Sequence, residues 1–261
     1  MVEAGRRVLI TGASSGIGLA LARHYLERGA VVAALARRRE LLDGLAAEFP
    51  GKVYVYALDV RDEAALQHAA NDFIERVGLP DAVIANAGVS TGTLTEYAED
   101  NDAFRQVMDI NVLGMMQTFQ PFIAELRKAG HGTLVGIASV AGFRGLPGAS
   151  AYSASKAAAI SYLESLRVEL HGTGVKVVTI CPGYIRTPMT AQNPYPMPFM
   201  LDVDVAARSM VQAIDRQRAY VVIPWQMALV GRVLKLLPRW LYDRLFARAP
   251  HKPRINKKVA G

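Results

Sequence analysis

The sequence predicts a single α/β domain, and three observations support this fold class. Short apolar segments alternate with helical patterns along most of the chain. The 261 residues provide enough chain for one large core, and 51% of them are hydrophobic, which is typical of a globular protein. There is no internal repeat and no interior linker, so we expect one domain over residues 1–224, followed by an extension over residues 225–261.

The positive charge of the chain is concentrated near its C-terminus. The formal net charge is +7, yet residues 225–261 hold nine Lys or Arg and one Asp, so the rest of the chain is close to neutral. A nucleic-acid surface is therefore not expected. The single cysteine, Cys181, rules out an intrachain disulfide and fits a reducing compartment. We expect a cytoplasmic protein with no metal site, no secretory leader and no spanning helix, since no run of about 18 apolar residues occurs.

The first predicted strand, residues 6–11, leads into the sequence TGASSGIG and then into a helical pattern that stops at Gly29. Glycines let the backbone turn tightly and approach a ligand, and free N–H groups at a helix start favour an anion such as pyrophosphate. A glycine-capped helix start without a ligand is the alternative. Because the segment directly follows the first strand, we favour a nucleotide site at Gly12, Gly16 and Gly18.

The second predicted strand, residues 30–36, is followed by three arginines. In NAD-binding proteins an acid near this point grips a ribose 2′-hydroxyl, but here Ala36 precedes the arginines. A guanidinium pairs well with a phosphate, so the sequence favours NADP(H) over NAD(H). Arg37 is the preferred candidate for a phosphate ligand, ahead of Arg38. The alternative is that the arginines only solvate a helix start.

The third and fourth predicted strands each end at a candidate cofactor contact. After residues 53–58, Asp59 could accept a hydrogen bond from an adenine amino group, and Val60 could pack on the ring. Asp59 or Asp62 could equally cap the helix that follows. After residues 81–86, small residues would let a cofactor ribose lie close, namely at Asn86, Ala87 and Gly88.

A long helix is predicted from about residue 100 to 128, with Asn111 at an otherwise apolar position. A buried amide needs hydrogen-bond partners. Asn111 therefore either makes a structural hydrogen bond at a helix kink or holds a water beside an active site.

Ser139, Tyr152 and Lys156 can form one reaction centre. Ser139 closes the fifth predicted strand, residues 132–139, and a glycine-rich turn leads back to a helix. Tyr152 and Lys156 are four residues apart and share a helix face. We expect the ammonium to lower the pKa of the phenol, so that Tyr152 can act as a general acid or base. By itself, this spacing would also suit a solvated lysine beside a packed tyrosine.

The C-terminal third contains the last strands, at 175–181 and 219–223, and two unusual segments. Residues 194–200 are rich in Pro, Met and aromatics, which suggests a lid over an apolar substrate or else ordinary packing. Residues 225–248 predict a basic amphipathic helix, kinked near Pro238. Such a helix can make peripheral contact with a membrane, or it can cover the substrate pocket or a subunit interface.

The order and spacing of these motifs resemble the short-chain dehydrogenase/reductase family over about residues 6–224. The resemblance implies a doubly wound Rossmann sheet of seven parallel strands with helices on both faces. It also implies a nicotinamide cofactor and a homodimer or homotetramer. The matching sequences are TGASSGIG (11–18), DV (59–60), NAG (86–88), Asn111, Ser139, YSASK (152–156) and PGYIRT (182–187).

The resemblance further implies roles for particular residues. The catalytic set is Asn111, Ser139, Tyr152 and Lys156, with Asn111 positioning a water that brings in the replacement proton. Together with the residues argued above, the expected cofactor contacts are Gly12, Ser14, Ser15, Gly16, Ile17, Gly18, Arg37, Asp59, Val60, Asn86, Ala87, Gly88, Tyr152, Lys156, Pro182, Gly183, Ile185 and Thr187.

These expectations lead to a function: NADPH-dependent reduction of an apolar or lipid-like ketone or 3-oxoacyl compound to an alcohol. One alternative is an NADP-dependent alcohol dehydrogenase working in the oxidative direction, which the arginines disfavour because NADP pools favour reduction. The other is a nucleotide-sensing protein that has lost the chemistry, which the complete catalytic set disfavours.

Overall fold

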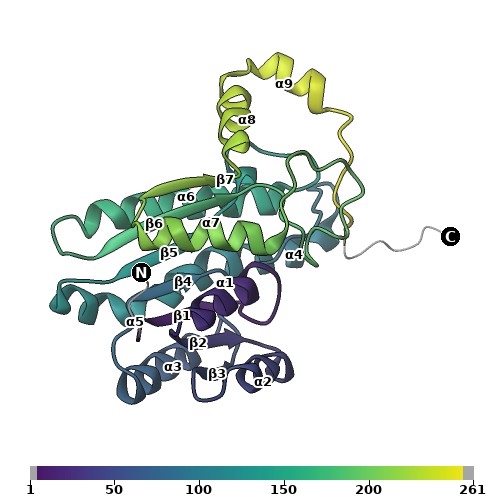
Figure 1. Ribbon diagram of the computed structural model, residues 1–261. Helices are drawn as coiled ribbons and strands as arrows, with labels where there is room; N and C mark the ends of the chain where they lie inside the picture. The colour runs from purple at the N-terminus through teal and green to yellow at the C-terminus, as the bar shows by residue number, and fades with distance from the viewer. Residues whose placement is uncertain (1–4, 255–261) are drawn as a thin grey trace.

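A seven-stranded parallel sheet forms the centre of the protein (Figure 1). The structure, a computed structural model, describes residues 5–254. The strand order is β3-β2-β1-β4-β5-β6-β7, and every neighbouring pair is parallel. The predicted Rossmann fold is confirmed, and each strand lies within two residues of its predicted range: β1 (Arg7–Thr11), β2 (Val31–Ala36), β3 (Val53–Ala57), β4 (Ala82–Ala85), β5 (Thr133–Ile137), β6 (Lys176–Pro182) and β7 (Tyr220–Ile223).

Helices cover both faces of the sheet, and each layer encloses its own apolar core. Successive strand residues point to opposite faces, so Val8 and Ile10 of β1 join one core while Leu9 joins the other. Because both faces are covered, a central strand such as β4 is buried throughout. The first core includes α1 (Gly16–Glu27), α2 (Arg39–Glu48) and α7 (Val203–Asp215), and the second includes α3 (Glu63–Arg76), α5 (Gly114–Ala129) and α6 (Ser150–Glu169).

The strand order reverses at β1, which pairs with β2 on one side and with β4 on the other. In doubly wound sheets the loops diverge at such a point and leave a crevice beyond the carboxyl ends of the strands. Ligands bind in this crevice, so the fold places the loops after β1 and β4 where a cofactor is expected.

The long helix expected over residues 100–128 is interrupted. It follows a short 3₁₀ turn, η1 (Ala98–Asp100), and consists of α4 (Asn101–Met108), a π-helical turn η2 (Asp109–Leu113), and α5. Asn111 lies within the π turn. Single π turns inside α-helices are frequent at functional sites, and here the turn brings a polar side chain onto a buried face.

The extension folds back on the body of the protein. It forms α8 (Trp225–Leu236) and α9 (Arg239–Phe246), and the break between them confirms the predicted kink near Pro238. Both helices project beyond the β7 edge of the sheet, and the chain then returns to the body (Figure 1). Residues 255–261 of the extension lie outside the described residues. Among residues 5–254, no helix has the length and apolarity needed to span a bilayer.

Candidate active site

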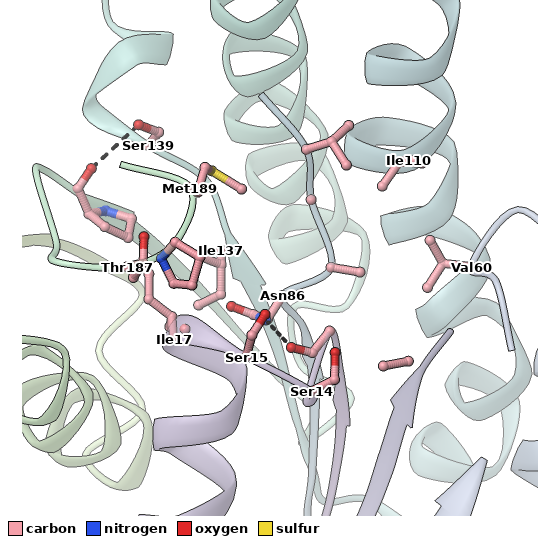
Figure 2. Close-up of a pocket in the computed structure, with 18 of the residues that line it drawn as sticks. Ser14, Ser15, Ile17, Val60, Asn86, Ile110, Ile137, Ser139, Thr187 and Met189 are labelled. Atoms are coloured by element: carbon pink, nitrogen blue, oxygen red, sulfur yellow. Dashed lines mark hydrogen bonds between the residues drawn. The ribbon is translucent and has the colours of Figure 1, made fainter. Parts of the chain in front are cut away.

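The loops at the carboxyl ends of the strands line a cavity of about 350 Å³ (Figure 2). Every residue expected to contact the cofactor lines this cavity except Gly18, and Ser139 lines it as well. The structure therefore brings together residues that are far apart in the sequence, from Gly12 to Thr190. Their contact with a cofactor remains a prediction.

The glycine-rich loop has the shape that a dinucleotide needs. Gly12 and Gly16 have φ angles of +70° and +55°, which favour glycine, and a Cβ at Gly12 would lie 2.9 Å from Asn86 Nδ2. Ser15, the N-cap of α1, makes no side-chain capping bond, so the first N–H groups of α1 are available to an anion. This backbone cradle fits the pyrophosphate of a nicotinamide dinucleotide.

Gly18 has a packing role in this loop. A Cβ there would lie 2.2 Å from the Gly12 carbonyl oxygen and 2.5 Å from Asn86 Nδ2. The residue is buried in α1 and does not line the cavity. Gly18 thus allows α1 to approach the loop closely, which differs from the direct cofactor contact that the sequence predicted.

Side chains at the ends of β1 and β4 hold the two loops together. The Thr11 hydroxyl accepts hydrogen bonds from the backbone N–H groups of Asn86 and Ala87, both at 3.1 Å. Asn86 Nδ2 donates in return to the Thr11 carbonyl at 3.0 Å. These reciprocal bonds fix the floor of the cavity at the point where the strand order reverses.

The arginines after β2 reach the glycine-rich loop. Arg37 and Arg38 both line the cavity, and Arg38 donates to the Ser14 and Ser15 hydroxyls at 3.0 and 2.9 Å. From the sequence, Arg37 was the preferred candidate for the phosphate ligand. The structure instead places the Arg38 guanidinium directly against the loop that would hold the cofactor phosphates.

The two acids after β3 have separate roles. Asp62 is the N-cap of α3 and accepts a hydrogen bond from Ala65 N at 2.9 Å, which confirms the capping alternative for this residue. Asp59 lines the cavity, and Arg61 donates to its carboxylate at 2.7 and 3.1 Å. This bond, with smaller contributions from charge, lowers the pKa of Asp59, so its carboxylate is ionised at neutral pH.

Ser139, Tyr152 and Lys156 converge on the far end of the same cavity. The Lys156 ammonium is almost fully buried, donates to the Ile137 carbonyl at 2.8 Å and lies 5.8 Å from the centre of the Tyr152 ring. Ser139 follows β5, and its hydroxyl is near enough to the Tyr152 phenol to influence the pKa of that group. The Ser139 hydroxyl donates to the Pro182 carbonyl at 3.4 Å, and a dashed line at Ser139 marks a hydrogen bond in Figure 2.

The pKa of Tyr152 differs from the expectation based on helical spacing. Burial raises the pKa of Tyr152 above its ordinary value, and the nearby Ser139 hydroxyl opposes this shift only in part. Burial also lowers the pKa of Lys156 to about 8. The expected lowering of the tyrosine pKa is therefore wrong for this structure, and the phenol is protonated at neutral pH.

Asn111 lies behind the cavity and makes structural hydrogen bonds. Its side chain is fully buried, and Oδ1 accepts from Val89 N at 2.8 Å. Nδ2 donates to the Val89 carbonyl and to the Ser155 hydroxyl, both at 3.0 Å. Both amide hydrogens are thus in use, so Asn111 positions the loop after β4 and the helix turn that carries Lys156. Its catalytic role with a water remains a prediction.

None of the residues 194–200, which were expected to form a lid, lines the cavity. Residues just before this segment line the cavity, including Met189, which is 39% exposed. Tyr195 packs edge-on against Tyr184 with ring centres 6.5 Å apart, whereas Phe199 is half exposed. Contact between residues 194–200 and a substrate remains a prediction.

Two residues near Tyr152, Ser90 and Lys252, were not expected from the sequence. Lys252, from the C-terminal segment, lies 6.0 Å from the centre of the Tyr152 ring. It donates to the Ser90 hydroxyl at 2.8 Å. No local motif marks either residue, because only the path of the folded chain brings them together.

The fold and this group of residues define a dinucleotide-binding oxidoreductase. A family model described as short chain dehydrogenase matches residues 6–196. The chain belongs to the short-chain dehydrogenase family. It uses a nicotinamide cofactor and interconverts carbonyl and alcohol groups on small molecules.

Individual relatives extend this result. An uncharacterized oxidoreductase of Myxococcus xanthus is 41% identical over 91% of this chain and 95% of its own length. The 2-dehydro-3-deoxy-L-rhamnonate dehydrogenase (NAD(+)) of a Sphingomonas species is 37% identical over 73% of this chain and 76% of its own. A crystal structure of a short-chain dehydrogenase from Burkholderia cenocepacia in complex with NADP has a TM-score of 0.81 and 28% identity, covering 94% of this chain and 99% of that one.

Proposed function

We propose that the protein uses NADPH to reduce an apolar or lipid-like ketone or a 3-oxoacyl compound to an alcohol. The observation that carries this proposal is the convergence of Ser139, Tyr152 and Lys156 on the cavity that the glycine-rich loop also lines. A proton donor and a nucleotide cradle in one cavity are the two parts that carbonyl reduction requires.

The side chains suggest how the reaction proceeds. When bound, NADPH supplies the hydride that reduces the carbonyl carbon. Tyr152 donates its phenolic proton to the carbonyl oxygen, and the Ser139 hydroxyl donates a hydrogen bond that orients this oxygen. The buried Lys156 ammonium then stabilises the phenolate until the proton is replaced. A phenol that is protonated at neutral pH suits a proton donor, which favours reduction over the oxidative alternative.

The preference for NADPH rests on the end of β2. Ala36 leaves no carboxylate to repel a 2′-phosphate, and Arg38 lies against Ser14 and Ser15. The Burkholderia structure contains NADP, whereas the Sphingomonas relative is named for NAD(+). A direct comparison of the two cofactors is therefore the first experiment.

That experiment measures NADPH and NADH consumption over a panel of ketones and 3-oxoacyl thioesters of graded chain length. We expect NADPH to be preferred, and we expect Arg38→Ala to reduce the preference by about tenfold or more because a charge-assisted phosphate contact is lost. Arg39→Ala is the matched control, since Arg39 is exposed and pairs with Asp43. A preference for NADH would reject the NADP assignment. NADPH binding without turnover on any substrate would favour the nucleotide-sensing alternative.

We also propose that α8 and α9 contact an anionic lipid surface. Their inner side packs on the segment after Ser139, where Arg144 donates to the Leu237 carbonyl at 2.8 Å and the Tyr242 hydroxyl donates to the Gly145 carbonyl at 2.5 Å. Their outer side is largely apolar and exposed. The large apolar side chains there that are more than half exposed are Trp225, Leu229, Val233, Leu236, Trp240 and Leu245.

The charge of this hairpin favours lipid over a second copy of the chain. Residues 225–248, which contain both helices, hold five basic residues and one acid, so two such surfaces would repel one another. Each basic residue near an anionic membrane contributes about 1 kcal/mol of attraction. The basic residues are Arg232, Lys235, Arg239, Arg244 and Arg248.

Vesicle flotation tests this contact. We expect the full chain to float with vesicles that contain phosphatidylglycerol, and expect Trp225→Ser combined with Trp240→Ser to reduce the bound fraction several-fold. Val168→Ser, at an exposed position on α6, is the control. Equal flotation of all variants would reject lipid contact at this surface. Light scattering shows whether the same substitutions instead change the homodimer or homotetramer that we propose.

A further inference from the structure

The C-terminal segment 251–254 forms a strap across the loop that follows β4. Gly92 N donates to the Pro253 carbonyl at 3.0 Å, and a Cβ at Gly92 would lie 2.1 Å from the Lys252 carbonyl oxygen. At Gly148, just before α6, a Cβ would lie 2.6 Å from the His251 side chain. The strap therefore fits closely against both the β4 loop and the start of the helix that carries Tyr152.

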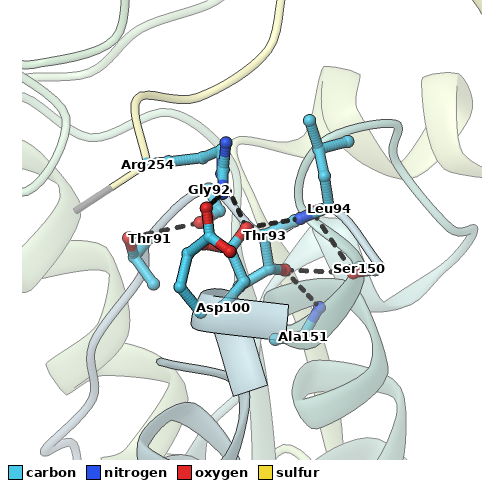
Figure 3. A network of polar contacts seen from close by, with 9 residues as sticks. Thr91, Gly92, Thr93, Leu94, Asp100, Ser150, Ala151 and Arg254 are labelled. Carbon is cyan, nitrogen blue, oxygen red and sulfur yellow. Dashed lines mark hydrogen bonds and ion pairs between the residues drawn. The ribbon is translucent and has the colours of Figure 1, made fainter. Parts of the chain in front are cut away.

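An ion pair anchors the strap. Arg254 Nε donates to the Asp100 carboxylate at 2.7 Å, and the Asp100 side chain is 5% exposed (Figure 3). Asp100 also accepts from Leu94 N at 2.9 Å, so one carboxylate ties the strap to the β4 loop. The Arg254 guanidinium stacks 3.6 Å from the centre of the Tyr97 ring. These contacts lower the pKa of Asp100, chiefly through the bond from Arg254.

The β4 loop is tied in turn to the start of α6. Figure 3 shows the Thr93 hydroxyl between Ser150 and Ala151, with Ala151 N donating to it at 3.2 Å and the Ser150 hydroxyl 3.0 Å away. Thr93 N also donates to the Gly148 carbonyl at 3.1 Å. Strap, loop and helix thus form one connected wall next to Tyr152.

Lys252 extends from this wall toward the reaction centre. Its ammonium donates to the Ser90 hydroxyl at 2.8 Å and lies 6.0 Å from the centre of the Tyr152 ring. Within residues 5–254, no carboxylate forms an ion pair with it. A partly buried cation without a counter-ion is costly, and such a cation is stabilised by a ligand that brings a negative charge.

We propose that Lys252 is a substrate-anchoring residue, whose ammonium binds an anionic group, a carboxylate or phosphate, on the carbonyl substrate. The proposal rests on the function proposed above and narrows its substrate class to carbonyl compounds that combine an apolar chain with an acid group. The strap holds the ammonium beside Tyr152, and Ser90 orients it. Burial lowers the pKa of Lys252 to about 8, so the group is largely charged at neutral pH and gains from pairing with an anion.

Calorimetry tests the anchor without any turnover. NADPH-loaded enzyme is titrated with saturated carboxylates of graded chain length and with the uncharged carboxamides of the same length. We expect the carboxylate to bind about tenfold more tightly at one or more lengths, and Lys252→Met to remove this difference. Lys128→Met, which removes the same charge from the exposed surface of α5, retains it. Equal or absent binding of the two ligands to the wild type, or a preference that survives Lys252→Met, would overturn the proposal.

Kinetics separates this proposal from the function on which it rests. Keto acids are compared with their methyl esters, and Lys252→Met is expected to raise KM for the acids about tenfold while leaving KM for the esters and for NADPH unchanged. Equal rates on acids and esters in the wild type reject the anchor and retain the reductase. Failure to reduce either class, with carboxylate binding intact, rejects the proposed substrates and retains the anchor.

Discussion

The nucleotide side of the cavity and the proposed substrate side beyond Tyr152 are built in different ways. On the nucleotide side, backbone atoms lie in close contact, as where Gly18 of α1 packs on the Gly12 carbonyl and Asn86 closes against β1. Beyond Tyr152, on the proposed substrate side, side chains from distant segments meet, as where Lys252 donates to Ser90. The nucleotide side consists of the glycine-rich loop and the strands next to it. The substrate side consists of segments far apart in the sequence that hydrogen bonds and ion pairs join.

This difference explains how proteins of one fold can keep the same nucleotide site while they bind different substrates. A backbone cradle depends on the path of the strands and on a few glycines, so it changes little while the fold is kept. A wall of side chains such as the strap can be replaced without moving the sheet. Substitutions on the two sides should therefore affect different measurements.

The largest expected effect separates chemistry from cofactor binding. Tyr152→Phe removes the proton donor and should lower kcat by about a hundred- to ten-thousand-fold while NADPH binding, followed by fluorescence, is unchanged. Tyr162→Phe is the control, because this partly buried tyrosine on the same helix does not line the cavity. Unchanged turnover in Tyr152→Phe would remove the residue from its role.

A second substitution acts where the two sides are joined. Asn111→Ala leaves the backbone groups of Val89 and the Ser155 hydroxyl without their partner, and we expect a loss of about 3 kcal/mol in unfolding free energy. Denaturant unfolding measures this loss. Asn71→Ala, at an exposed amide on α3 that bonds Gln67, should change stability by about 0.5 kcal/mol or less. Similar unfolding free energies for the two variants would show that the hydrogen bonds of Asn111 do not hold the nucleotide side and the substrate side together.

A third substitution tests the backbone cradle. Gly18→Ala places a methyl group 2.2 Å from the Gly12 carbonyl oxygen, so we expect a loss of about 1–3 kcal/mol and weaker NADPH binding. Gly44→Ala meets no atom within 4 Å in α2 and should stabilise the protein by about 0.5–1 kcal/mol. Thermal unfolding compares the two, and equal melting temperatures would contradict close packing at Gly18.

The smallest expected effect is confined to the substrate side. Arg254→Met breaks the anchor of the strap, and we expect KM for keto acids to rise about tenfold while KM for NADPH is unchanged. Arg105→Met, which loses an exposed pair with Asp102, should leave both values unchanged. A matching rise in KM for NADPH would mean that the strap supports the whole cavity.

The sequence alone determined the fold and the nucleotide side because these depend on local patterns. The apolar strand segments and the sequence TGASSGIG can each be recognised within a few residues. Because parallel strands all end at one edge of the sheet, the residues that follow them were expected to line one cavity. The reaction centre was also identified from spacing, since Tyr152 and Lys156 are separated by one helical turn.

Only the tertiary structure decided the electrostatics and the substrate side. Burial, which depends on everything packed around a group, raises the pKa of Tyr152 where helical spacing predicted that it would fall. Arg38 rather than Arg37 donates hydrogen bonds to the glycine-rich loop, and the order of residues does not show which of two adjacent exposed side chains turns toward that loop. Lys252 reaches Tyr152 because the folded chain returns across the body after α9, and a contact between residues 100 positions apart leaves no periodic trace in the sequence.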